Sequence, residues 1–159
     1  MGKGHGELEI FDYAFTHSKL LNSTKWICKA TGRYIVKNAD TIFNGISTYP
    51  EAEIIANLST NLTWADSRMF VFQQEFYKRY LKENGHLIND FEGVHFEHVV
   101  AKAILLAIAK GMKWHLLPEI PIYAGVFGRS NTSYPTNIFF VMKCKIYQKV
   151  KKRILKHSL

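Results

Sequence analysis

The hydrophobic residues of two long stretches recur at the spacing of an α-helix. Between residues 64 and 83 they lie three or four positions apart, which places them on one helical face; they are Met69, Phe72, Phe76 and Tyr80. Residues 96–112 are apolar around most of a helical circumference, so we expect a helix at the centre of the core, with Leu105 buried in it. The pattern therefore predicts two long helices, over about 64–83 and 96–112.

Shorter segments predict strands, turns and smaller helices. Residues 26–31 and 34–37 favour β-structure on either side of Gly32-Arg33 and predict a hairpin, and residues 122–127 predict a further strand. Residues 7–21 predict a helix, and Pro50 predicts the first turn of another that continues to residue 56. Glycine occupies every second position from residue 2 to residue 6, so residues 1–6 predict a flexible leader.

Residues 138–150 fit two patterns. Apolar residues recur every four positions, as in a helix; they are Ile138, Met142, Ile146 and Val150. The alternation of Lys143 and Lys145 with apolar neighbours fits a strand equally well. We expect a strand to about Ile146, followed by a basic helix to Lys156.

These elements together predict an α+β fold. A small, mainly antiparallel sheet would use residues 26–37 and 122–146, and the two long helices would pack on it. The chain of 159 residues is long enough for one domain with a hydrophobic core. We expect a single compact domain over residues 7–147 and a basic C-terminal helix or tail over residues 148–159.

Composition excludes two classes of protein. Hydrophobic residues make up 47% of the chain and charged residues 21%, whereas intrinsic disorder requires low hydrophobicity. The longest strictly apolar run, residues 103–109, is far shorter than the roughly 20 residues that a membrane-spanning helix needs. We therefore expect a soluble globular protein without a transmembrane segment.

Charge is distributed unevenly along the chain. The formal net charge is +8, from 21 basic and 13 acidic residues, and the last acidic residue is Glu119. Residues 1–119 hold 13 of the basic residues and are formally neutral, so residues 120–159 carry the whole net charge. The eight basic residues of this last quarter are Arg129, Lys143, Lys145, Lys149, Lys151, Lys152, Arg153 and Lys156.

Such a concentration of cations points to an anionic partner. Lysine and arginine neutralise phosphates through cation density, without needing a fixed motif. A basic amphipathic helix can also lie on an acidic membrane or insert into a large assembly. The sequence predicts a non-catalytic binding or assembly component that docks on nucleic acid or an acidic macromolecular surface through its basic C-terminal quarter.

One cluster of histidine and carboxylate residues offers an alternative, catalytic function. His95 and His98 are three positions apart at the start of the predicted core helix, a spacing that lets two imidazoles reach one metal ion. Asp90 and Glu97 are the nearby carboxylates that could assist catalysis. The alternative function is a small metal-dependent hydrolase or nuclease. Because no HExxH motif accompanies the pair, we favour the binding role and expect no cofactor and no bound metal.

The two cysteines and the N-terminal residues indicate the cellular compartment in which the protein resides. Cys28 and Cys144 form no CxxC pair, so a thiolate zinc site is unsupported. The first residues carry no apolar signal region. We therefore expect an intracellular protein that is not secreted and has free thiols.

Overall fold

The computed structural model describes residues 2–125 and 138–156, which group into two compact units. The first unit comprises Met1–Ala30 and Glu51–His115, and the second comprises Thr31–Pro50 and Leu116–Leu159. Each unit is built from two separate stretches of the chain, so no single linker in the sequence divides them. The structure is α+β, as predicted, and the single domain expected over residues 7–147 stays a prediction.

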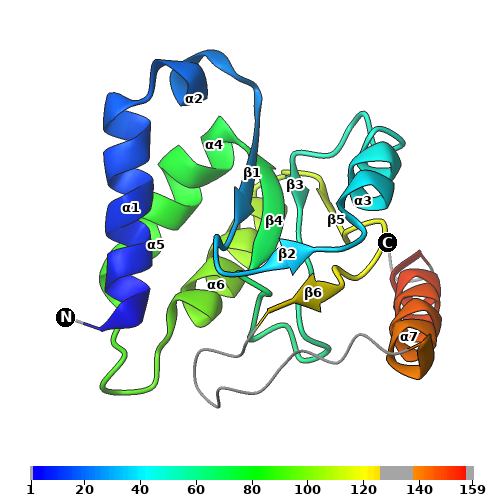
Figure 1. Cartoon of the computed structure of the whole chain (residues 1–159). Helices are drawn as coiled ribbons and strands as arrows, with labels where there is room; N and C mark the ends of the chain where they lie inside the picture. Colours follow the sequence, from blue (N-terminus) through cyan, green and yellow to red (C-terminus); the bar gives the residue numbers. More distant parts are fainter. Residues whose placement is uncertain (1, 126–137, 157–159) are drawn as a thin grey trace. The chain divides into compact units, whose positions relative to one another are not determined.

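A four-stranded sheet forms the middle of the first unit (Figure 1). Its strands lie in the order β1 (Trp26–Ala30), β4 (Met69–Gln73), β3 (Ile54–Ile55) and β5 (Trp114–His115). β4 pairs antiparallel with β1 and with β3, whereas β3 and β5 are parallel. The sheet is therefore mixed, and the predicted hairpin over residues 26–37 is wrong, because β1 pairs with β4.

The first unit also contains several helical segments. They are α1 (Lys3–His17), α2 (Lys19–Ser23), α4 (Gln74–Phe76), the π-helix η1 (Tyr77–Leu81), α5 (Lys82–Asn84), the 3₁₀ turn η2 (Gly85–Leu87) and α6 (Phe96–Ala109). α1 begins at Lys3, inside the segment whose glycines predict a flexible leader, and Gly4 is buried. A Cβ at Gly4 would lie 3.0 Å from the backbone nitrogen of Phe96, so glycine lets α1 approach the start of α6 closely.

The long helix predicted over residues 64–83 is wrong in its first half. Residues 69–73 form β4, and the consecutive segments α4, η1 and α5 continue only from Gln74 to Asn84. The apolar residues Phe70, Val71 and Phe72 are all buried, because β4 has a strand on each side and is covered on both faces. A continuous apolar run suits such a central strand and also mimics helical spacing.

The predicted core helix forms as α6, although it ends at Ala109 rather than at residue 112. Gly111 follows with φ +94°, a left-handed conformation that stops the helix. Val100 and Ile104 are fully buried, whereas Leu105 is 38% exposed. The expected burial of Leu105 is therefore wrong, because α1, α4, α5 and η1 cover only part of the circumference of α6.

Within the residues that the structure describes, the second unit contains two short strands and two helices. β2 (Ile35–Val36) pairs antiparallel with β6 (Tyr123–Ala124), and the helices are α3 (Ala39–Ile46) and α7 (Ile138–Lys156). The expected strand to Ile146 is wrong, because α7 is helical throughout. The expected helix from Pro50 is also wrong: Ile54 and Ile55 form β3, a strand of the first unit, where β4 and β5 supply hydrogen-bonding neighbours.

A helix that crosses a bilayer must be long and predominantly apolar. None of the helices in residues 2–125 and 138–156 is long and apolar enough to span a membrane.

The buried and exposed sides of α6 predict unequal losses of stability for similar substitutions. Ile104→Ala should lower the free energy of unfolding by about 2–5 kcal/mol, because it opens a cavity in a packed core. Leu105→Ala removes a partly exposed side chain and should cost less than about 1 kcal/mol. Urea denaturation of both variants measures the difference, and equal losses would contradict the observed orientation of α6.

Candidate functional site

Residues 118–122, the segment just before β6, form the floor of the candidate site. Asn38, at the start of α3, holds it with its side-chain amide. The Asn38 Nδ2 donates to the Ile120 carbonyl at 3.1 Å, and its Oδ1 accepts the Ile122 N–H at 2.8 Å. Pro118 lies against Gly45 of α3, where a Cβ would come within 2.4 Å of the proline ring. These contacts fix residues 118–122 against α3.

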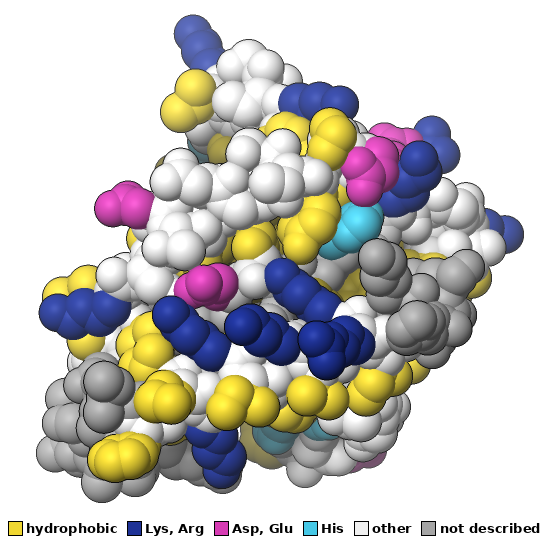
Figure 2. Space-filling model, turned by 90° about the vertical axis from the view of Figure 1, so that its right-hand side faces the viewer, with side chains coloured by type: hydrophobic (Ala, Val, Ile, Leu, Met, Phe, Trp, Pro, Cys, Tyr) yellow, Lys and Arg dark blue, Asp and Glu magenta, His cyan; other side chains and the backbone are white. Residues whose placement is uncertain are grey.

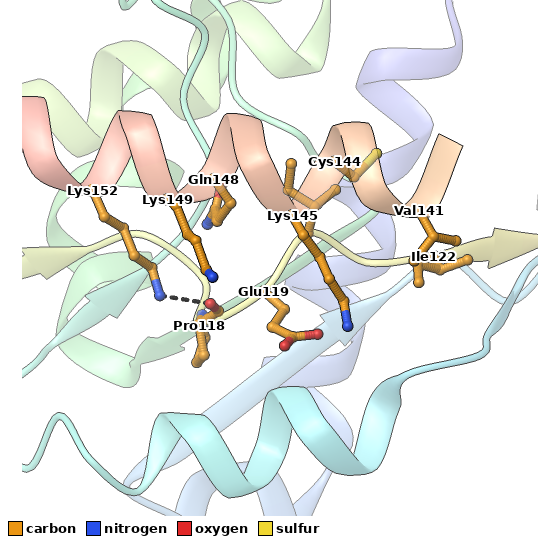
Figure 3. Close-up of a pocket in the computed structure, with 10 residues that line it drawn as sticks. Pro118, Glu119, Ile122, Val141, Cys144, Lys145, Gln148, Lys149 and Lys152 are labelled. Carbon is orange, nitrogen blue, oxygen red and sulfur yellow. Dashed lines mark hydrogen bonds between the residues drawn. The ribbon is translucent and has the colours of Figure 1, made fainter. Parts of the chain in front are cut away.

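Two side chains attach α7 to this floor (Figure 3). Gln148 is buried, and its Nε2 donates to the Leu117 carbonyl at 2.6 Å. Lys152, one turn later, donates from Nζ to the Pro118 carbonyl at 2.5 Å. A buried carbonyl without a donor is costly, so these bonds determine which face of α7 points inward. Val141 and Cys144 lie on the same inner face, both partly buried.

A pocket of about 300 Å³ lies between α7 and the floor. Its walls combine apolar side chains with charged ones; the lining residues are Pro118, Glu119, Ile120, Ile122, Val141, Cys144, Lys145, Gln148, Lys149 and Lys152. Figure 3 shows Lys145, Lys149 and Lys152 extending from the helix toward the segment that carries Glu119. Three ammonium groups face one carboxylate among these lining residues, so the positive potential favours an anion at this edge.

The opposite face of α7 carries exposed apolar side chains. We call Phe139, Met142, Ile146, Val150 and Ile154 the apolar stripe; their exposed fractions range from 50% for Val150 to 81% for Phe139. Figure 2 shows a row of hydrophobic side chains running beside a row of lysine and arginine side chains. The four-residue repeat in the sequence signalled this stripe, but only the inward direction of Gln148 shows that the stripe faces outward.

The predicted anion-binding residues occupy different environments on α7. Lys143, Lys145, Lys149 and Arg153 are exposed, and Lys151 and Lys152 are partly buried. Burial disfavours the charged ammonium of Lys151 and lowers its pKa, although Tyr147 acts in the opposite direction. Lys156 ends the helix, and Arg129 lies outside the described residues.

The residues of the predicted chemical cluster meet at two helix ends of the first unit. Asp90 Oδ2 accepts the Gly4 N–H in the first turn of α1 at 2.9 Å, and its Oδ1 lies 3.0 Å from Nδ1 of His95, the N-cap of α6. His98 Nδ1 accepts the backbone N–H of His95 at 3.1 Å. These contacts place a carboxylate where two helix dipoles favour negative charge.

Hydrogen bonding also alters the acidity of Asp90. The contact with His95 is the main cause, and together with the Gly4 N–H it outweighs burial and lowers the pKa of the Asp90 carboxyl. Glu97 is oriented elsewhere, because its Oε1 accepts the Ser67 hydroxyl at 2.9 Å. Trp64 lies edge-on to His98, with 4.7 Å between the ring centroids. The cluster therefore stabilises the start of α6.

Two observations concern possible catalytic groups: the arrangement of potential metal ligands and the state of the two cysteines. In the part of the chain that the structure describes, no group of three or more His, Cys, Asp or Glu side chains is arranged to hold a metal ion. Cys28 and Cys144 are free thiols, and burial raises the pKa of each, which is the reverse of the activation that a nucleophilic cysteine needs.

Comparisons of the chain with known proteins found no match. No family model matches the chain, and no curated protein and no solved structure matches it.

Asp90 should make the stability of the first unit depend on pH. Its lowered pKa means that the carboxylate adds stability above its ordinary pKa, and this stability is lost as pH falls through the lowered value. Asp90→Asn should therefore lower the urea midpoint at neutral pH, and the gap to the unchanged protein should close as the pH falls below the ordinary carboxyl pKa of 3.8. Glu92→Gln, an exposed carboxylate on the same turn, is the control. A gap that is constant with pH would contradict the role of the charge.

Gln148 should determine how firmly α7 is held. Gln148→Leu keeps a similar side-chain volume but leaves the Leu117 carbonyl without this donor. The loss should weaken the attachment of α7 by about 1–3 kcal/mol. Hydrogen exchange at the amides of α7 should accelerate in this variant and stay unchanged in Lys149→Leu, which alters an exposed neighbour. Equal protection in both variants would show that the amide does not anchor the helix.

Proposed function

We propose that this protein is a non-catalytic binding or assembly component that docks on an anionic macromolecular surface through its basic C-terminal quarter. The observation that carries the proposal is the composition of α7 and its attachment. The helix holds seven basic residues in 19 and no acidic one. Two hydrogen bonds, from Gln148 and Lys152, attach it to the floor of the second unit.

The attachment matters because it fixes the cations before any partner binds. Lys145 and Lys149 are exposed and lie four positions apart, about 6 Å along the helix axis. A flexible tail would lose conformational entropy when it ordered on a partner, whereas cations on an anchored helix avoid part of that cost. Their spacing suits repeated phosphates, carboxylates or sulfates, which attract them without a fixed sequence motif.

The alternative of a metal-dependent hydrolase receives less support. The Nδ1 atoms of His95 and His98 are engaged with Asp90 and with backbone at the start of α6. Glu97 contacts Ser67 rather than either histidine. Capping of α6 accounts for the histidine contacts without catalysis, and Glu97 bonds a serine outside the helix, so the basic helix is the feature that remains to be explained by function.

Charge reversal on α7 should weaken binding to a polyanion. Heparin is a suitable probe, because it is densely anionic and has no lipid or base-pair structure. The double variant Lys145→Glu/Lys149→Glu should elute from immobilised heparin at clearly lower salt, whereas Lys145→Arg/Lys149→Arg should elute near the unchanged protein.

The matched control is Lys25→Glu/Lys102→Glu, which reverses two exposed lysines of the first unit and changes net charge by the same amount. It should shift elution less than the α7 pair does. Equal shifts would show that net charge alone sets the affinity, and the proposal of a docking surface on α7 would fail.

A further inference from the structure

We propose that the anionic partner is the surface of a lipid bilayer, on which α7 lies in the plane of the interface with its apolar stripe inserted. The inference rests on the proposed docking role of α7 and adds the class of partner. It starts from the apolar stripe, for which a purely electrostatic docking role has no use. Five large apolar side chains, each at least half exposed, lie on one face of this helix.

The stripe has the geometry of an interfacial helix. At about 100° per residue its five members fall within an arc of about 120°, and they extend from Phe139 to Ile154, over most of α7. Lys145 and Lys149 follow one edge of the arc, and Lys143 and Arg153 lie between its members. Long basic side chains can bury their stems beside such a stripe and still keep their charges in the headgroup layer.

A nucleic-acid partner would account for the cations of α7 but not for its apolar stripe. Phosphate contacts would use the cations, but they would leave Met142, Ile146 and Val150 in water. Base stacking would use aromatic rings such as Phe139 and the neighbouring Tyr147, which is 48% exposed, but it would leave the aliphatic members of the stripe without a role. An anionic bilayer satisfies both features, because its headgroups attract the lysines while the acyl boundary takes the apolar side chains.

A protein partner fits less well on charge grounds. Lysine is depleted at the buried centre of protein interfaces, because its strongly hydrated ammonium is costly to desolvate. α7 carries six lysines and one arginine along the same length as the stripe. A headgroup layer stays hydrated and anionic, so it accepts these cations without burying them. With seven charges the helix cannot cross the membrane, and the structure assigns it to the surface.

Sedimentation of the full chain with lipid vesicles tests the inference. Vesicles of phosphatidylcholine with about 30 mol% phosphatidylserine should bind the protein, and vesicles of phosphatidylcholine alone should bind it far less. Ile146→Ser/Val150→Ser removes apolar surface from the stripe and should lower the partition coefficient at least about tenfold. Both residues are exposed, so the variant should keep the circular dichroism spectrum and melting temperature of the unchanged protein.

The matched control is Ile10→Ser/Leu20→Ser, which removes two exposed apolar side chains from α1 and α2. It should bind anionic vesicles like the unchanged protein. The stripe variant should also keep its elution from heparin, since its cations are intact. Loss of vesicle binding with retained heparin binding is the result expected only if the stripe inserts.

The outcomes separate this inference from the proposed function. If the protein binds heparin or duplex DNA but not anionic vesicles, the bilayer is the wrong partner and the docking role of α7 stands. If the stripe variant binds vesicles as well as the unchanged protein, the stripe is not inserted and the inference is overturned. If the protein binds neither heparin nor vesicles, both proposals fail.

Discussion

The burial of β4 on both faces is the constraint on which the first unit depends. Met69–Gln73 pairs with β1 on one side and with β3 on the other, and Phe70 and Phe72 are completely buried. Aromatic contacts extend from this strand to Phe11 of α1, whose ring centroid lies 6.3 Å from that of Phe70 and 6.0 Å from that of Phe72. The strand therefore joins both the sheet and the helical layer to one core.

The second unit depends more on polar contacts. Asn38 holds the segment of residues 118–122, and that segment presents the carbonyls that receive Gln148 and Lys152. Directional bonds of this kind determine the rotation of α7 about its own axis, which hydrophobic packing alone specifies poorly. The rotation decides which lysines line the pocket and which apolar side chains face outward, so both functional proposals depend on it.

Electrostatics stabilise helix ends in the first unit, whereas in the second unit they support the proposed binding role. In the first unit the carboxylate of Asp90 lies between the N-terminal ends of α1 and α6, and His95 completes the arrangement. Here a charge is largely compensated by its neighbours. On α7 the cations share their helix with no acidic residue, so their field extends outward. This concentration of positive charge on an attached helix is the feature on which the proposed docking role rests.

The sequence by itself determined the α+β class, a core helix that begins at Phe96 and the segregation of positive charge after Glu119, because each follows from composition or from a long local period. It could not assign residues 69–73, since a continuous apolar run suits a helix or a buried strand, and the choice depends on the hydrogen bonds that β1 and β3 supply. It also left residues 138–150 between strand and helix. Only the tertiary structure decided that Gln148 faces inward and that Ile146 and Val150 face solvent, because a helical repeat fixes the relative positions of side chains but not the direction in which the helix presents them.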